Sequence, residues 1–275
     1  SQNKIAFGYE GDGESMLIKI LSDVPDDFSS VITKEIEKDT LNYWYRPKLE
    51  VDSLIFEVIR GQSIDTAVVR IKDFKSDSLV FKPLSSNLKL QDSYIISAST
   101  PLEYVDESKV RVMNKDSVFV KATMVLDPTT NSVVLEFGKT EKNSYEIQLL
   151  PTALTDFYGV ANDTLNYRAS TKLQSDYGDV RISISNGVYP LIVQIINDKG
   201  LVIESAVALN ASAVDFQSVT PGVYFLRAVF DTNKNGSYDS GSYLSKIQPE
   251  RVSYASTPIE VRAGWDTIEE FVLAD

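Results

Sequence analysis

Apolar and polar residues alternate with a period of two along almost the whole chain. Short runs rich in β-branched and aromatic residues include KIAFGY (4–9), SLIFEVI (53–59), SVVLEF (132–137) and VRISIS (180–185). Such runs, bounded by turn residues, are typical of β-strands with one buried face. Only residues 27–38 could pass for a helix, and three consecutive β-branched residues at 31–33 argue against one. The pattern therefore predicts an all-β protein.

The expected strands fall into three successive groups with no helical segments between them, which favours sandwiches over alternating strands and helices. A chain of 275 residues, 43% of them hydrophobic, is long and apolar enough for several packed cores. Three domains of about 90 residues each lie within the usual size range. We therefore expect three consecutive β-sandwich domains, over residues 1–86, 87–172 and 173–275.

The third group contains the clearest register signal. The run at 223–230 contains a single arginine among apolar residues, so the strand face that carries Arg227 is expected to be solvent-exposed. We expect Tyr224, Leu226 and Ala228 to point into the core. The residues NDKG at 197–200 separate two apolar runs and predict a β-hairpin.

Two aromatic features of the sequence, one a row of three residues and the other a single tryptophan, are candidates for ligand-binding surfaces. Tyr43, Trp44 and Tyr45 stand in a row. Because neighbouring residues of a strand point to opposite faces, at least one of them must be core, and packing is favoured over a carbohydrate-stacking platform. For Trp265 we expect a lid on the last sandwich rather than a ligand site.

Composition excludes several classes of function. The net charge of −12 repels phosphate backbones and anionic lipid surfaces, so we expect no nucleic-acid partner. The chain has no His and no Cys, which removes disulfides, thiolate metal sites and imidazole chemistry and leaves only metals with oxygen ligands. No apolar run reaches the ~20 residues that span a bilayer. We expect no transmembrane segment, no catalytic residue and no organic cofactor.

The most specific chemistry follows the strand at 223–230. Oxygen-bearing side chains alternate here in the pattern Asp-x-Asn-x-Asn-Gly, at Asp231, Asn233, Asn235, Ser237 and Asp239. Alternating oxygen ligands that converge on one point, with a Gly that permits the sharp turn, suit a Ca²⁺ ion. Ser237 would contribute its backbone carbonyl. Ser242 replaces the bidentate Glu of an EF-hand. A plain hairpin with a type I′ turn at Asn235-Gly236, in which the flanking Asp and Asn side chains cap backbone amides, would also explain the Gly. The sequence leaves both interpretations open.

The segment YEIQLLPTALTDFYGVANDTLNYRAST (145–171) resembles the closing half of the bacterial Ig-like domain of the S-layer type. That pattern has a Tyr-led strand, an Asp before a Gly-Asn turn and a final Ser-Thr; the residues on it are Tyr145, Asp156, Gly159, Asn162 and Thr171. Two residues separate Gly159 from Asn162, so the turn is longer here. Upstream, residues 95–115 resemble the opening Ser-x-Pro segment of the same domain.

The segment FQSVTPGVYFLRAVFDTNKNGSYDSG (216–241) is similar to prealbumin-like modules of the collagen-adhesin B type, which share its Pro-Gly-x-Tyr strand. As a whole the chain resembles the C-terminal half of Ig-like-domain-containing envelope proteins of Bacteroidetes. The resemblance implies an extracytoplasmic protein, lipid-anchored at the outer membrane through an upstream segment, with no established enzymatic activity. It also implies other envelope proteins or surface polymers as partners. The strand at 180–185 has no Lys, so the isopeptide crosslink of some such modules is not expected.

Three functions therefore compete. The leading expectation is a non-enzymatic structural or protein-interaction module of the bacterial cell envelope, stabilised by Ca²⁺. The second is a carbohydrate- or peptide-binding surface adhesin, which needs exposed aromatic residues beside converging polar groups. The third is a hydrolase that works through paired carboxylates, which no signature in the sequence places at catalytic separation.

Overall fold

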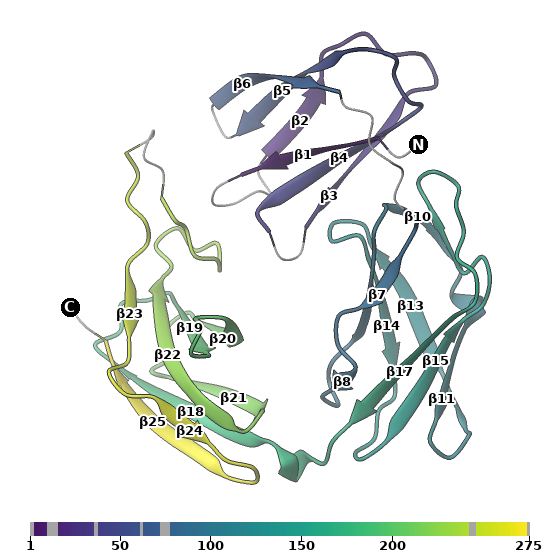
Figure 1. Cartoon of the computed structure of the whole chain (residues 1–275). Helices are drawn as coiled ribbons and strands as arrows, with labels where there is room; N and C mark the ends of the chain where they lie inside the picture. The colour runs from purple at the N-terminus through teal and green to yellow at the C-terminus, as the bar shows by residue number, and fades with distance from the viewer. Residues whose placement is uncertain are drawn as a thin grey trace. The chain divides into compact units, whose positions relative to one another are not determined.

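The computed structural model describes residues 3–9, 16–35, 38–60, 63–71, 78–241 and 246–273. These residues form β-strands and two short 3₁₀ helices, η1 (Glu107–Lys109) and η2 (Gln174–Asp176), and they contain no α-helix (Figure 1). The all-β prediction is confirmed, and the stretch 27–38 contributes strand β3 (Ser29–Lys34) rather than a helix. No helix in the described part of the chain is long and apolar enough to cross a membrane.

The chain divides into two compact units, Ser1–Thr171 and Lys172–Asp275. The described residues contain three separate hydrophobic cores, two in the first unit and one in the second. Each core is enclosed by two sheets and is therefore a β-sandwich. The expected division into three domains at 86/87 and 172/173 stays a prediction.

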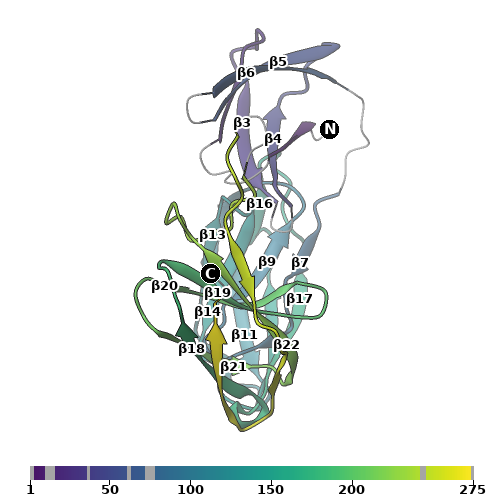
Figure 2. The ribbon, with the colours of Figure 1, turned by 90° about the vertical axis from the view of Figure 1, so that its left-hand side faces the viewer.

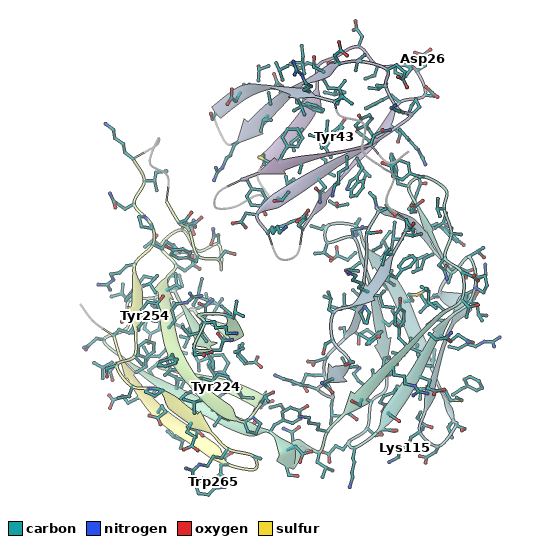
Figure 3. All side chains as sticks on the ribbon, viewed as in Figure 1. Asp26, Tyr43, Lys115, Tyr224, Tyr254 and Trp265 are labelled. Carbon is teal, nitrogen blue, oxygen red and sulfur yellow. The ribbon has the colours of Figure 1, made fainter. Side chains whose placement is uncertain are left out.

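The first sandwich packs the sheet β1-β4-β3 against the sheet β2-β5-β6. Its strands are β1 (Asn3–Gly8), β2 (Met16–Ile20), β3, β4 (Thr40–Arg46), β5 (Ser53–Arg60) and β6 (Ser63–Arg70), with β5 and β6 adjacent in Figure 2. Tyr43 and Tyr45 lie in the core, and Tyr43 is labelled in Figure 3. Trp44 is buried on the opposite face of β4, where its Nε1 donates to Thr33 Oγ1 at 2.9 Å. All three aromatic side chains are buried, so packing is confirmed over a carbohydrate platform.

The second sandwich packs the five-stranded sheet β12-β11-β15-β17-β8 against the four-stranded sheet β13-β14-β9-β7, with a short pair β10-β16 at one end. Its strands are β7 (Phe81–Pro83), β8 (Asn87–Leu88), β9 (Tyr94–Ala98), β10 (Leu102–Val105), β11 (Val110–Asn114), β12 (Phe119–Val120), β13 (Ala122–Asp127), β14 (Ser132–Phe137), β15 (Ser144–Leu149), β16 (Leu154–Asp156) and β17 (Leu165–Thr171). Strand β7 pairs with β9, so this sandwich takes in residues that precede the expected boundary at 86/87.

Two buried polar residues hold the loop that connects β16 to β17. Asp156 accepts hydrogen bonds from the backbone N–H groups of Tyr158 and Val160 and from the Thr100 hydroxyl. The Asn162 carboxamide accepts from the Leu154 N–H at 2.7 Å and donates to two backbone carbonyls. Both residues belong to the motif that resembles the bacterial Ig-like domain. Their polar atoms satisfy backbone groups of a buried turn, which is a structural role.

Contacts within the first unit join its two sandwiches. The Tyr158 hydroxyl donates to the Asn3 carbonyl and accepts from the Asn3 N–H, and burial raises the pKa of Tyr158 to about 12. Arg46 forms an ion pair of 3.1 Å with Glu103 and also hydrogen-bonds to the carbonyl of Phe157. These bonds tie the first strand and the end of β4 to the second sandwich.

The third sandwich, in the second unit, packs the sheet β21-β18-β25 against the sheet β20-β19-β22-β23, with β24 paired to β22. Its strands are β18 (Gly178–Ser185), β19 (Leu191–Ile196), β20 (Val202–Ala208), β21 (Ala213–Val219), β22 (Gly222–Phe230), β23 (Val252–Tyr254), β24 (Ile259–Val261) and β25 (Asp266–Val272). The hairpin predicted at 197–200 joins β19 to β20 and is confirmed.

The register predicted for β22 is also confirmed. Tyr224, Leu226 and Ala228 are core residues, and Arg227 on the other face donates to the Gln194 side chain at 2.7 Å. The prediction for Trp265 is wrong, because 61% of this residue is exposed and its ring lies beside the Arg262 guanidinium (Figure 3). Its backbone follows Gly264, whose φ of +71° makes a tight turn between β24 and β25.

Candidate functional site

The predicted calcium-binding loop begins at the end of β22 and leads towards β23. Residues 231–241 and 246–251 of this connection are described, and Ser242 lies outside the described residues. Asp231 is only 1% exposed, because it directly follows the buried end of β22. Its backbone N–H donates to the carbonyl of Pro190 at 3.2 Å, which fixes where the loop starts.

Hydrogen bonds link the oxygen-bearing side chains of the loop to one another and to its backbone. The Asp231 carboxylate accepts from the N–H groups of Asn235 and Gly236, at 3.0 and 2.9 Å. One oxygen of Asp239, Oδ2, accepts from the carboxamide nitrogens of both Asn233 and Asn235, at 2.6 and 2.9 Å. The side chains of three of the five predicted residues thus meet, and Asp231 is joined to them through the backbone of the turn. Ser237 donates its N–H to the Asn235 carboxamide oxygen at 2.8 Å.

The backbone of the loop contradicts the type I′ turn, although the Asp and Asn side chains do cap backbone amides as the hairpin interpretation expects. A type I′ turn at Asn235-Gly236 needs positive φ at both residues. Here φ is positive at Lys234 (63°) and Gly236 (74°), while Asn235 is not among the residues with positive φ. The two strands that flank the connection end at Phe230 and begin at Val252, far too far apart in sequence for a two-residue turn. The interpretation as a type I′ turn is therefore wrong.

Glu250 belongs to the same loop, and no pattern in the sequence predicted its place there. It is 8% exposed. Its Oε1 accepts from the N–H and the hydroxyl of Thr232, at 2.7 and 3.1 Å, and its Oε2 accepts from the Asp239 N–H at 3.3 Å. Glu250 is 19 positions from Asp231, so no local spacing rule could have linked the two.

The carboxylates of this loop have no ion-pair partner within the described part of the chain. Among the described residues, no Lys or Arg forms an ion pair with Asp231, Asp239 or Glu250. Taking a carboxylate out of water without an opposite charge costs several kcal/mol. Backbone N–H groups offset part of this cost for Asp231 and Glu250, and a bound cation would offset more.

The donor set fits a weak oxygen-ligand site and not a transition-metal site. In the described part of the chain, no three Asp, Glu, His or Cys side chains lie close enough together to hold a metal by themselves. A cation here would therefore also need oxygens from Asn233, Asn235 and the backbone. Rotating each carboxamide by 180° would place its oxygen where its nitrogen now contacts Asp239. Ca²⁺ is the ion that accepts such mixed oxygen ligands.

The resolved pKa shifts of carboxyl groups lie in one direction. Hydrogen bonds from Ser108 and from Thr130 lower the pKa of Asp106 and of Asp127, and the hydrogen bond from Arg262 lowers that of Glu260. A catalytic general acid needs a pKa raised towards neutrality. These three groups are therefore unsuited to that role.

Comparisons with known proteins return distant similarities. No family model matches the chain, and no curated protein matches it. Among solved structures, it is similar to the Bacillus anthracis TIE protein at 12% identity and a TM-score of 0.23, over 74% of this chain and 41% of that one. A tandem segment of titin follows at 9% identity and 0.21, over 99% and 94%. An endo-fucoidan hydrolase of glycoside hydrolase family 107 follows at 6% identity and 0.22, over 100% and 42%.

The chain thus spans less than half of the TIE protein chain that it matches. TM-scores this low carry neither fold nor function from one protein to another. The function of this chain has to be argued from its own residues.

Proposed function

We propose that the chain is a non-enzymatic structural or protein-interaction module of the bacterial cell envelope. The observation that carries the proposal is that two buried polar residues of the motif bind only to the protein itself. The side chains of Asp156 and Asn162 hydrogen-bond to the backbone of a turn. These residues carry the resemblance to bacterial Ig-like domains. A scaffold needs such rigid turns, and an active site needs polar groups that face a substrate.

The resemblance to Bacteroidetes envelope proteins supports an extracytoplasmic location and an outer-membrane lipid anchor in the full-length protein. Other envelope proteins or surface polymers would then be its partners. The test is to fractionate cells that make the native protein, label them with a radioactive fatty acid, and treat intact cells with protease. Recovery in the outer membrane with incorporated label supports the proposal. Recovery in the cytoplasm refutes it.

We also propose that one Ca²⁺ binds at Asp231, Asn233, Asn235, Ser237 and Asp239. Support comes from the contact of the Asn233 and Asn235 side chains with Asp239 and from the hydrogen bonds of the Asp231 carboxylate to the same turn. Within the described residues, no ion pair neutralises the carboxylates of the loop. Glu250 holds the loop in place by accepting hydrogen bonds from Thr232 and from the Asp239 N–H. We expect a dissociation constant of about 10⁻⁴–10⁻³ M, as in extracellular modules. At the tighter end of this range, about 10⁻⁴ M, millimolar Ca²⁺ would stabilise the second unit by about 1–2 kcal/mol.

Titration calorimetry and thermal melts, with and without chelator, test this site. Wild type and the control Asp198→Asn, an exposed carboxylate in the β19–β20 turn, should both melt higher in Ca²⁺. Asp231→Asn and Asp239→Asn should lose the rise and the heat of binding. Asp239 is only partly buried, so its variant folds even where Asp231→Asn does not. An identical calcium response in all four proteins, or none in wild type at several times the expected dissociation constant, contradicts the proposal.

A further inference from the structure

The outer face of the five-stranded sheet in the second sandwich carries side chains that neither the core nor the calcium loop uses. Two rows of residues cross it, and the strand register defines both. One row runs from Phe119 through Met113 and Glu146 to Arg168. The other, two residues further along each strand, is formed by Arg111, Gln148 and Asn166. Both rows point away from the core.

This face is hollowed. A depression of about 470 Å³ lies between the two rows, and a second one of about 380 Å³ adjoins it and shares Met113, Glu146 and Arg168 with it. Lys115, labelled in Figure 3, lines the second depression. Volumes of 300–1,000 Å³ are typical of ligand sites. The four strands β12, β11, β15 and β17 give the face a width of roughly 14 Å, or three strand spacings.

The charge of the face is opposite to that of the chain. Arg111, Lys115 and Arg168 stand against one acid, Glu146, in a protein whose net charge is −12. The Arg111 side chain has no ion pair or hydrogen bond within the described residues. Arg168 pairs with Glu146 at 2.8 Å, but its side chain is 83% exposed. Exposed pairs of this kind contribute little, so a ligand carboxylate can take Arg168 at low cost.

The remaining groups suit a sugar. Gln148 and Asn166 are linked by a 3.0 Å hydrogen bond, and each keeps a free donor or acceptor that can meet a hydroxyl group. Phe119 is 69% exposed at the edge of the hollow, where its ring can cover the apolar face of a pyranose. A guanidinium binds a carboxylate through two parallel hydrogen bonds.

We infer that this face binds an acidic polysaccharide whose sugar units carry carboxylates. An acidic peptide fits less well. Extended peptides bind sheets by pairing with a free edge. Within the described residues, the unpaired backbone groups of this sheet lie along its edges, on the outer side of β12 and on β17 before Ser170. The hollow between the two rows is lined by side chains instead, and side chains are what a polysaccharide contacts. The inference goes beyond the structural role proposed above and does not depend on the calcium loop.

Titration calorimetry of the full chain with oligogalacturonate tests it, with a neutral maltooligosaccharide and a polyglutamate peptide as comparison ligands. We expect binding of oligogalacturonate alone. Arg111→Gln and Phe119→Ala should each weaken it at least tenfold, and both change exposed side chains, so the fold is kept. The control Arg181→Gln removes an exposed arginine from the outer face of β18 and should bind like wild type.

Four outcomes would overturn the inference. They are no binding of oligogalacturonate, equal binding of the neutral sugar, equal binding of polyglutamate, and a loss in Arg181→Gln as large as that in Arg111→Gln. Equal binding of polyglutamate that survives in Phe119→Ala would mean attraction between charges only. None of these results depends on whether calcium binds or where the protein resides in the cell.

Discussion

The Pro-Gly-x-Tyr motif at the start of β22 requires Gly at position 222 because the aromatic ring of Tyr224, two residues later, packs against it. The Tyr224 hydroxyl donates to the Thr220 carbonyl at 2.8 Å, so the ring folds back over the backbone at Gly222. A Cβ at residue 222 would lie 3.0 Å from that hydroxyl and 3.1 Å from the ring carbon Cζ. The φ of Gly222 is not positive, so the ring and not the backbone conformation excludes a larger residue.

The contact predicts that substitutions at Gly222 and Tyr224 are not additive. Tyr224 is a core residue and 9% exposed, so Tyr224→Ala should cost about 3–5 kcal/mol. Gly222→Ala forces the ring aside and should cost about 1–3 kcal/mol. In the double variant the new methyl group meets no ring. It should be no less stable than Tyr224→Ala, which gives a coupling energy of about 1–3 kcal/mol.

Tyr224→Phe separates the ring from its hydroxyl. Thr220 is exposed, so water can replace the lost donor, and this variant should lose no more than about 1 kcal/mol. The control is Gly138→Ala, because a Cβ at residue 138 meets no atom within 4 Å. It should leave stability within about 0.5 kcal/mol of wild type.

Urea unfolding of the full chain, read by pulsed hydrogen exchange, measures these energies. Peptides from β22 report the second unit, and peptides from β14 report the first unit as an internal reference. Additive losses at Gly222 and Tyr224 would show that the ring does not lie over Gly222. A Tyr224→Ala variant with unchanged β22 protection would show that the register of the strand is wrong.

Two further predictions concern the second sandwich. Asn162→Ala leaves the buried Leu154 N–H without its acceptor and should cost about 2–4 kcal/mol of stability in the same assay. The control Asn166→Ala changes an exposed position and should cost less than about 0.5 kcal/mol. Equal losses in the two variants would contradict the role given to Asn162. The hydrogen bond from the Thr130 hydroxyl lowers the pKa of Asp127 in the folded protein. The pair therefore stabilises the fold fully at a pH above the ordinary Asp pKa of about 3.9. This stabilisation is lost as the pH falls through the lower pKa of the folded state. Thr130→Val should raise the pKa of Asp127 in a carboxyl ¹³C NMR titration, and an unchanged pKa would refute the cause.

The sequence predicts strand faces well wherever a charge marks the wet side. Arg227 among apolar neighbours was enough to place Tyr224, Leu226 and Ala228 in the core. Alternation says which residues share a face, but not what covers that face. Trp265 shows the limit, because it lies in a turn where no period applies and the turn directs it into solvent.

The candidate calcium loop was predictable in part for a similar reason. Asp231, Asn233, Asn235 and Asp239 are close in sequence, and a sharp turn brings them together with little help from the rest of the fold. Glu250 lies at the far end of the connection between β22 and β23. Its contact with Asp239 depends on the path of the whole connection, which no local spacing pattern predicts. The type I′ interpretation failed because the loop has its positive φ at Lys234 and not at Asn235.

The proposed polysaccharide face could not be found from sequence, because its members come from four strands. Arg111 and Arg168 are 57 positions apart, and only the pairing of β11, β15 and β17 brings them onto one surface. A slip of one residue in either pairing would bury the arginine and expose an apolar residue such as Ile147, which is now 0% exposed. The core therefore fixes the register, and the register fixes the outer rows. Core substitutions that shift β15 should reduce both oligogalacturonate binding and stability, whereas Phe119→Ala should weaken binding at least tenfold and leave stability unchanged.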